Sequence, residues 1–358
     1  MIKNSITVVR EKMRGVGRRP SSTVYCLLST VYCLIPSQSA LQPAGPQAER
    51  IIGLWWMMLY VTGAVFLVVM GFLVAALVRR RRAYGGEAAP EVPDTRPEPG
   101  VERRMSHVVL AGVGMTVVIL FVFLVRSYVT GRALDSLHEQ EHLTVTVVGH
   151  QWWWEVRYDN STAAYVLTTA NEIHLPVGRP VLFKLTSTDV IHSFWVPNLH
   201  GKTDLVPGHE NVTWLKADRE GTYRGQCAEF CGHQHAHMAF TVVVEPYEKF
   251  KAWYDAQLAP AAEPSTQAQS QGRHVFLSSP CVMCHTVRGT DAGSRVGPDL
   301  THVASRGTIA AGTLENTRGH LAGWVADSQQ FKPGNRMPPN NLEPADLQAL
   351  LDYLQSLK

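Results

Sequence analysis

The sequence has little charge. Only 18% of its 358 residues are Asp, Glu, Lys or Arg, and 33 basic against 30 acidic side chains leave a net charge of +3. It also lacks any cluster of basic residues interleaved with aromatic ones. Nucleic-acid-binding domains usually carry such a basic patch or stripe. The composition therefore argues against a nucleic-acid partner.

Charge is missing altogether from two long segments. Residues 51–78, IIGLWWMMLYVTGAVFLVVMGFLVAALV, and residues 108–125, VVLAGVGMTVVILFVFLV, contain no charged side chain. As helices, the first exceeds the ~30 Å hydrocarbon layer of a bilayer and the second is just long enough to cross it. We predict a two-span transmembrane α-hairpin within residues 41–130, in contact with membrane lipid. The alternative is a pair of buried helices in a soluble protein.

Arginines between the two segments predict the orientation of the hairpin. Residues 79–82 are all arginine, and Arg103 and Arg104 precede the second segment. Positive residues in short loops stay in the cytoplasm, so the chain after Arg126 is expected on the outer side. Arg126 and Arg132 at the outer end are a weaker signal in the opposite direction.

The first 40 residues have the features of a secretory signal peptide. A basic start precedes the apolar stretch STVYCLLSTVYCLIP and the small residues SQSA, which predict cleavage near Ala40. Ser and Thr interrupt the apolar stretch, so a misassigned start codon or a poorly ordered extension are alternatives. After cleavage, Cys26 and Cys33 would have no role in the mature protein.

The exported part divides into two domains. Short runs within residues 131–254 alternate apolar and polar side chains between Gly, Pro, Asn and Asp, which predicts an antiparallel β-sandwich. Residues 255–272, rich in Ala, Pro, Gln and Ser, read as a flexible linker. Residues 273–358 end in helically spaced leucines and predict a small all-α domain.

A dense group of sulfur and imidazole side chains lies in the sandwich region. Disulfides are the default for exported cysteines, but a methionine and histidines surround this pair. The group comprises Cys227, Cys231, His235 and Met238, with His192 upstream. This soft ligand set favours copper over calcium, magnesium or manganese, and zinc rarely needs the methionine. A second cysteine beyond the one of a blue-copper site suggests two copper ions that share bridging thiolates.

The last domain contains the sequence CVMCHT. Its Cys-x-x-Cys-His motif, Cys281, Cys284 and His285, predicts covalent attachment of haem c with the histidine as proximal iron ligand. Met337, followed by two prolines, is the candidate sixth ligand, which would raise the reduction potential. A plain core methionine is the alternative at this position. Together with Pro298 and the final helix, the domain is similar to class I cytochromes c.

With these residues in view, the chain resembles cytochrome c oxidase subunit II from Ile51 to about Glu245. The resemblance implies a cupredoxin-like sandwich and a dinuclear copper (CuA) site formed by His192, Cys227, Glu229, Cys231, His235 and Met238. In the family the two sulfurs bridge both coppers, each histidine binds one copper, the methionine is a weak ligand, and the glutamate ligates through its main-chain carbonyl. His233 and His237 are surplus and are expected to be loop or surface residues.

Three further roles are implied by the same resemblance. The Glu229 carboxylate would help to hold a magnesium ion at the border with subunit I, with a simple surface carboxylate as the alternative. Trp152, the first residue of the run WWW, would be the electron input point at the protein surface, with core packing of at least one of the three tryptophans as the alternative. Alternation on a strand would place Trp152 and Trp154 on one face and Trp153 on the other. Glu102 only loosely matches a family glutamate near a proton path, and a solvated loop carboxylate is the alternative.

The combined prediction is the electron-input subunit of a bacterial haem–copper cytochrome c oxidase with a fused cytochrome c. It would sit in the inner membrane with its copper and haem domains outside. Its partners would be oxidase subunits I and III and an electron donor, cytochrome c or another periplasmic protein. Subunit I would reduce O2 to water with proton translocation, because this chain has two spans and no intramembrane histidine cluster. The alternatives are the equivalent subunit of a CuA-type nitric oxide reductase and a membrane-anchored electron shuttle.

Overall fold

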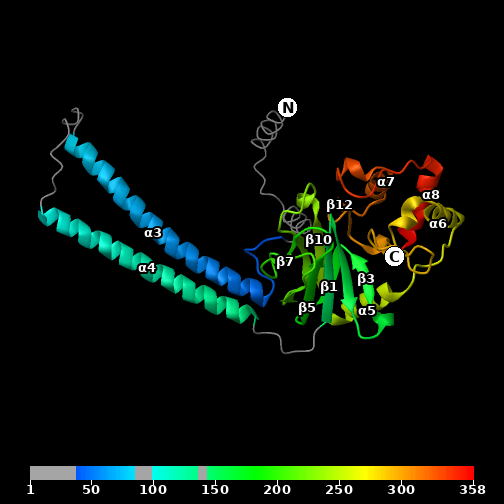
Figure 1. Ribbon diagram of the computed structural model, residues 1–358, viewed down its shortest axis with the longest axis horizontal. Helices are drawn as coiled ribbons and strands as arrows, with labels where there is room; N and C mark the ends of the chain where they lie inside the picture. The colour runs from blue at the N-terminus through cyan, green and yellow to red at the C-terminus, as the bar shows by residue number, and fades with distance from the viewer. Residues whose placement is uncertain (1–37, 85–98, 136–142) are drawn as a thin grey trace, which may run out of the picture.

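The computed structural model describes residues 38–84, 99–135 and 143–358. Two long helices, a two-sheet β-sandwich and a helical unit follow one another along the chain (Figure 1). The predicted fold class is therefore confirmed. The predicted signal peptide falls almost entirely on residues outside the described ranges.

The two apolar segments form the long helices α3 (Pro46–Tyr84) and α4 (Pro99–Asp135). Both helices are long and apolar enough to cross a membrane, and the apolar part of each is not buried inside the protein. Helix α3 continues beyond its uncharged part through Arg79–Arg82, because arginine is a good helix former and suits the negative end of the helix dipole. The helices lie close together beside the sandwich and separate towards their other ends (Figure 1).

Two five-stranded sheets make up the sandwich, in the orders β3-β2-β1-β5-β8 and β4-β10-β9-β6-β7. Side chains of β2 and β5 alternate between partly exposed and buried, as the sequence pattern predicts. Between the sheets lies a core that includes Trp154, Tyr158, Phe183 and Phe240. The strands are β1 (Leu143–His150), β2 (Trp153–Asp159), β3 (Leu167–Ala170), β4 (Glu172–Pro176), β5 (Pro180–Ser187), β6 (His192–Trp195), β7 (Thr203–Leu205), β8 (Asn211–Lys216), β9 (Gly221–Cys227) and β10 (Ala239–Glu245).

The sequence pattern predicted an antiparallel sandwich, but the observed sandwich also contains parallel strand pairs. Strands β1 and β5 pair in parallel, and so do β4 and β10. Adjacent strands joined by short turns run antiparallel, but both parallel pairs join strands separated by several others along the chain. Local alternation sets the buried face of a strand and leaves the choice of partner open.

The C-terminal unit packs helix α6 (Gln267–Ser278) against α8 (Pro344–Ser356), with α7 (Arg318–Ala326) beside them. Its core includes Phe276, Leu350 and Tyr353. Gly272 lies in α6 where it crosses α8, and a Cβ atom there would be 1.9 Å from the Ala349 carbonyl oxygen. A short β-ladder and single 3-10 turns complete the described chain: β11 (Thr308–Ile309), β12 (Leu314–Glu315), and the turns Ala163–Tyr165, His235–His237, Pro280–Met283, Val303–Ser305 and Ser328–Gln330.

The predicted flexible linker is largely helical. Helix α5 (Tyr247–Leu258) includes its first residues and α6 its last, which leaves residues 259–266 between the helices. Even this part is fixed: Ala261 N–H donates to the Arg288 carbonyl at 2.8 Å. Thr266 caps α6 by accepting a hydrogen bond from the Gln269 backbone N–H. Because α6 buries only a narrow face, its apolar periodicity was too weak to notice in the sequence.

The helical unit is packed directly on the sandwich. Ala239 N–H of β10 donates to the Ala311 carbonyl at 2.9 Å. Gly307 N–H donates to the Glu172 carboxylate at 3.0 Å. The Gln234 amide donates to the Pro333 carbonyl at 2.7 Å. These bonds tie the two units together close to the sulfur-rich loop that follows β9.

Candidate functional site

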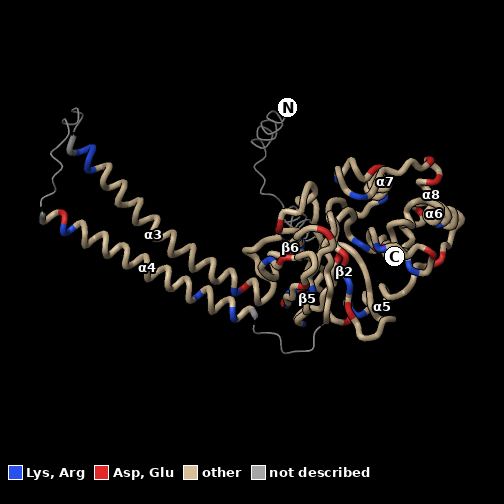
Figure 2. Tube along the Cα trace, viewed as in Figure 1, with Lys and Arg blue, Asp and Glu red and all other residues tan. Residues whose placement is uncertain are grey.

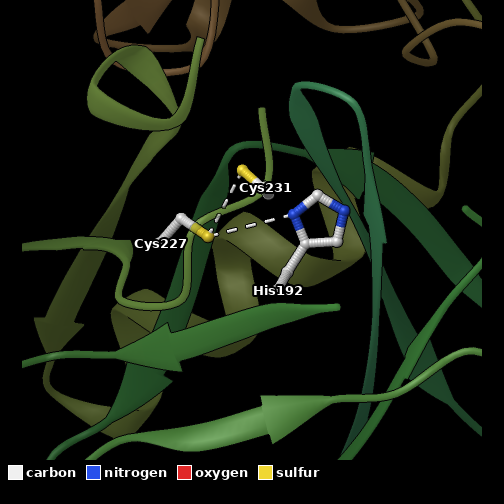
Figure 3. A group of neighbouring side chains, drawn as sticks. All are labelled: His192, Cys227 and Cys231. Atoms are coloured by element: carbon white, nitrogen blue, oxygen red, sulfur yellow. Dashed lines mark hydrogen bonds between the residues drawn. The ribbon is translucent and has the colours of Figure 1, made fainter. Parts of the chain in front are cut away.

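Sulfur and imidazole atoms converge at one end of the sandwich. His192 opens β6 and Cys227 closes the neighbouring strand β9, and Cys231 follows in the next loop (Figure 3). Their candidate ligand atoms all lie within 4.8 Å of one another. The Cys227 and Cys231 sulfurs are 3.7 Å apart, and His192 Nδ1 is 3.9 Å from the Cys227 sulfur. Strand pairing thus brings together residues that are far apart in the sequence.

The loop between β9 and β10 supplies the rest of the group. His235 Nδ1 lies 3.7 Å from the Cys231 sulfur, and the Met238 sulfur lies 3.8 Å from it. The Glu229 carbonyl oxygen is 3.1 Å from the Cys227 sulfur. The side chains of His192, His235 and Met238 and the main-chain carbonyl of Glu229 therefore each lie within 3.9 Å of one of the two sulfurs. His192, Cys227, Cys231 and Met238 are each no more than 2% exposed.

Both cysteines are free thiols. Their 3.7 Å separation far exceeds the ~2.05 Å of a disulfide bond. Hydrogen bonding from Cys231 and His192 lowers the pKa of Cys227, whereas the neighbouring thiolate and burial raise the pKa of Cys231. The pair of thiols therefore loses its first proton easily and retains its second. A bound metal ion would displace that second proton, because cysteine binds metals as the thiolate.

Asp189 fixes the orientation of His192. Its carboxylate lies 2.9 Å from His192 Nε2, so that ring nitrogen carries the proton and Nδ1 faces the sulfurs. The backbone N–H groups of Gln151 and Val190 hold the carboxylate at 2.7 and 2.8 Å. Burial raises the pKa of Asp189, but its hydrogen bonds outweigh this effect and the net shift is downward. The carboxylate therefore stays ionised beside the imidazole.

The Glu229 side chain points away from the sulfurs. Its carboxylate is 44% exposed and pairs with Lys202 at 2.9 Å, which itself contacts Asp204 at 3.4 Å. Of the surplus histidines, His233 is exposed, and His237 Nδ1 lies 2.8 Å from the Gln234 side-chain oxygen. The main-chain carbonyl of Glu229 therefore faces the Cys227 sulfur, whereas its carboxylate faces the surface.

The Cys-x-x-Cys-His motif lines a cavity of about 290 Å3 in the helical unit. Cys281, Cys284, His285 and Met337 all border this cavity. Apolar side chains close much of the rest, among them Val303, Ile309, Leu321 and Trp324. Three side chains hold the backbone of Met337. Its carbonyl accepts from the Ser328 hydroxyl and the Gln329 amide, and its N–H donates to the Asn335 side-chain oxygen.

The His285 ring is oriented by backbone atoms. Its Nδ1 donates to the Pro298 carbonyl at 2.8 Å, which leaves Nε2 without the proton and available to a metal. Burial lowers the pKa of His285 and favours the neutral imidazole. Gly297 packs against the ring, and a Cβ there would lie 2.9 Å from His285 Cε1. The motif therefore presents a fixed neutral ligand.

Both sites fit the groups that the sequence predicts. One ion at the usual metal–sulfur distance of ~2.3 Å can contact both sulfurs of a pair 3.7 Å apart. The additional imidazoles and thioether form the soft donor set of a copper site. Two thiols, one oriented imidazole and a thioether around an apolar cavity suit covalent haem.

Two protein families match the chain. Residues 143–245 match the family described as cytochrome C oxidase subunit II, periplasmic domain, and residues 269–358 match cytochrome c. Cytochrome c oxidase subunit 2 of Alkalihalophilus pseudofirmus is 35% identical over 327 residues, covering 89% of this chain and 91% of that protein. The chain belongs to the cytochrome c oxidase subunit 2 family.

Other relatives agree with this membership. Cytochrome c oxidase subunit 2 of Bacillus subtilis is 28% identical over 342 residues, which are 90% of this chain and 92% of that protein. A solved periplasmic domain of cytochrome oxidase subunit II from Bradyrhizobium japonicum is 30% identical and covers 33% of this chain and 94% of its own, with a TM-score of 0.31. The two family matches and the relatives that match along most of its length identify the chain as an electron-input subunit of a cytochrome c oxidase with a cytochrome c domain.

Trp152 of this oxidase subunit is not at the surface, where the sequence analysis placed it. It is 8% exposed and lies in the turn before β2, so the strand alternation begins only at Trp153. Its indole N–H donates to the Cys231 carbonyl at 2.9 Å. Trp152 and Trp153 also line the cavity of the cytochrome c domain. The docked cytochrome c domain covers this tryptophan.

Sequence reasoning missed two side chains of the site. Asp189 stands three residues before His192, and a carboxylate close to a candidate histidine ligand could have pointed to it. Lys332 stands in the loop that leads to Met337 and is 2% exposed. Nothing in the sequence marks it, because its partners are backbone carbonyls of distant segments.

Proposed function

We propose that this subunit accepts electrons from a periplasmic donor, cytochrome c or another protein, and delivers them to oxidase subunit I. Subunit I would reduce O2 to water with proton translocation. The chain would carry a covalent haem c and a dinuclear CuA centre for this purpose. When bound, both groups supply one-electron oxidation and reduction.

One observation carries this proposal: the two candidate sites face each other through Trp152. The tryptophan borders the cavity of the Cys-x-x-Cys-His motif, and its indole N–H bonds the carbonyl of Cys231. A single hydrogen bond thus connects the copper-site loop with the wall of the cavity that the other ligand set borders. Such an arrangement suits internal electron transfer within one polypeptide.

The residues of the copper site would work by holding a fixed geometry. The thiolates of Cys227 and Cys231 and the imidazoles of His192 and His235 would hold the two coppers. Met238 and the Glu229 carbonyl would be the weaker ligands. Asp189 keeps Nδ1 of His192 aimed at the sulfurs. Because these groups are buried and already in place, little rearrangement would accompany a change of charge.

The haem residues would likewise be preorganised. Cys281 and Cys284 would hold the haem covalently through their sulfurs, and His285 Nε2 and the Met337 sulfur would bind its iron. The Pro298 carbonyl fixes the imidazole tautomer. Methionine opposite histidine raises the reduction potential, which suits an oxidising respiratory chain.

Arginines support the proposed placement in the bacterial inner membrane. The arginines at 79–82, 103 and 104 lie at the ends of α3 and α4 that are distant from the sandwich (Figure 2). These ends would stay in the cytoplasm by the positive-inside rule. The copper and haem domains would then face the periplasm, and the helices would contact subunit I and lipid, with subunit III as a further partner.

Magnesium at the border with subunit I is a finer part of the proposal. The Glu229 carboxylate is exposed and is a suitable oxygen ligand, but Lys202 now neutralises it. A magnesium ion would have to displace Lys202, with ligands from subunit I. Binding of magnesium is therefore expected only in the assembled oxidase.

The test uses the full chain purified in its oxidase complex. We expect two copper ions and one covalently attached haem per copy of this subunit, and an electron spin shared by the two coppers. The measurements are elemental analysis, haem staining of the denatured subunit, and the hyperfine pattern of the paramagnetic spectrum.

Two matched variants separate the sites. C227S should lose the two coppers of this subunit and keep its covalent haem, and a C281A/C284A double variant should lose the covalent haem and keep both coppers. One copper or none in the wild-type subunit, counted in addition to the copper of subunit I, would contradict the proposal, as would zinc in their place or a subunit without covalent haem.

A further inference from the structure

Lys332 is a buried lysine at the contact between the cytochrome c domain and the sandwich. It is 2% exposed. Its Nζ donates to the carbonyl oxygens of Trp152 at 2.9 Å and His237 at 2.8 Å, both in the copper domain. A third bond reaches the Ala310 carbonyl, in its own domain, at 3.2 Å. One ammonium group therefore joins three backbone segments from two domains.

The environment of Lys332 is selective for a lysine. Within the described residues, its polar partners are these carbonyls, and an ammonium has three N–H donors and no acceptor. Burial disfavours the charged form and lowers the pKa of Lys332 to about 7. The three hydrogen bonds act in the opposite direction, because only the charged ammonium has a donor for each of the three carbonyls. Lysine is seldom buried unless its charge is compensated. Its position here marks a specific contact.

Lys332 also lies between the two candidate sites. It borders the cavity of the cytochrome c domain together with Trp152. Its acceptor His237 directly precedes the copper-site residue Met238, and its acceptor Trp152 bonds Cys231 through the indole N–H. A shift of the Lys332 side chain would therefore move the backbone of Trp152 and His237, which lie next to the copper-site residues and, in the case of Trp152, at the cavity of the cytochrome c domain.

We propose that Lys332 is a positioning residue that holds the haem cavity against Trp152, and that internal electron transfer depends on this contact. The inference rests on the proposed function of the two sites. It concerns how the domains are held and adds no ligand to either site. The short tether of residues 259–266 keeps the domains near each other, and Lys332 selects one orientation among those that the tether permits.

Two backbone amides report directly on this docking. Ala239 N–H donates to the Ala311 carbonyl and Gly307 N–H donates to the Glu172 carboxylate, so both bonds cross the contact between the domains. Hydrogen exchange at these amides requires the domains to separate locally. Their protection therefore measures docking independently of any bound metal.

The experiment replaces Lys332 by methionine in the full-length subunit within the oxidase complex. K332M keeps the length and apolar stem of the side chain and leaves three carbonyls without a donor. We expect exchange protection at Ala239 and Gly307 to fall about tenfold or more, equivalent to ~1.4 kcal/mol of docking free energy. We also expect electron transfer from haem c to copper, followed optically after rapid photoreduction, to slow about tenfold or more.

Copper content, haem content and both midpoint potentials should stay at wild-type values, which a merely structural role would not preserve. K332Q, whose amide donates two hydrogen bonds, should give intermediate protection and rate and serves if K332M fails to fold. K251M is the matched control, because Lys251 is an exposed lysine of α5 that pairs with Asp255.

Both effects must appear together. Unchanged protection, an unchanged transfer rate, or slower transfer explained by lost metal or shifted potentials would each overturn the role of Lys332. Absence of copper or haem in the wild-type complex would contradict the proposed function instead. The exchange measurement would still decide whether Lys332 docks the domains.

Discussion

At each candidate site, an atom outside the ligand set orients an imidazole. The Asp189 carboxylate holds His192 by Nε2, and the Pro298 carbonyl holds His285 by Nδ1. The two rings therefore leave opposite nitrogens unprotonated: Nδ1 of His192, which faces the sulfurs, and Nε2 of His285, whose ring borders the cavity of the cytochrome c domain. In both cases the hydrogen bond fixes the tautomer, because the nitrogen that donates it carries the proton and the other nitrogen is left free to bind a metal.

Removal of the Asp189 charge should weaken copper binding. D189N preserves the shape of the side chain, but its amide no longer provides the negative charge that favours the Nε2–H tautomer of His192. We expect copper affinity to fall about 10–100-fold, measured by competition with a chelator. D255N, at an exposed aspartate of α5, is the control and should bind copper like the wild type. Equal affinity in D189N would show that His192 needs no such support.

A methyl group beside His285 should disturb haem ligation. In G297A the new Cβ would lie 2.9 Å from His285 Cε1, so the ring must rotate or shift. We expect a changed haem absorption spectrum and a shifted midpoint potential in the purified complex. G293A provides the comparison, because a Cβ at Gly293 meets nothing within 4 Å. Identical spectra in both variants would argue against a fixed proximal ring.

At the level of elements, strand pairing and helix crossing decide what the local sequence leaves open. Pairing of β6 with β9 places His192 near Cys227, although 35 residues separate them. The crossing of α6 and α8 likewise depends on one small residue. Gly272 allows the α6 backbone to approach the Ala349 carbonyl, which explains a glycine inside a helix despite its low helix propensity.

Substitutions at two helical glycines should have opposite effects on stability. G272A places a Cβ 1.9 Å from a backbone oxygen and should lower the free energy of unfolding of the cytochrome c domain by about 1–3 kcal/mol. G319A in α7 meets nothing within 4 Å and should be neutral or stabilising by up to ~1 kcal/mol. Thermal unfolding followed at the haem band measures both. A stable G272A would show that the helices can separate without loss.

On the scale of the whole molecule, the two exported domains form one packed unit. Besides Lys332, a buried cluster joins them: Glu172 of β4 accepts from Gly307, and its carboxylate lies 3.2 Å from His174 Nε2. Arg306 of the cytochrome c domain donates to Thr169 of β3 at 3.3 Å. Polar bonds of this kind give the contact a defined geometry as well as affinity.

This cluster predicts loss of docking in acid. Burial raises the pKa of Glu172, but His174, the Gly307 N–H and Arg306 outweigh it, so the pKa lies below its ordinary value of 4.5. A carboxylate with a lowered pKa stabilises the docked form fully above about 4.5, and this contribution disappears as the pH falls through the lowered pKa. The stability difference between wild type and E172Q should be constant above about pH 5 and shrink in more acidic solution.

Thermal unfolding of both proteins across this pH range makes the measurement. E248Q, at an exposed glutamate of α5, should differ little from the wild type throughout. A difference between wild type and E172Q that grows in acid would have the wrong sign and would exclude this role for Glu172.

The chemistry of the sites was predictable and their surroundings were not. Close spacing revealed the residues of the β9–β10 loop and the haem motif, because ligands on one loop are near each other in any fold. Asp189 and Lys332 went unnoticed. The contact of Asp189 with His192 depends on the orientation of the imidazole ring, and the partners of Lys332 are carbonyls that are distant in the sequence. The exposed position predicted for Trp152 was wrong, because a second domain covers it.

The sequence alone determined the apolar spans, the alternating strands and the ligand types, because these depend on local patterns of hydrophobicity and on side-chain chemistry. Tertiary structure decided the parallel strand pairs, the helical order of the supposed linker and the seating of one domain on the other. Those features depend on contacts between distant backbone segments, whose free energy leaves no local signature along the chain.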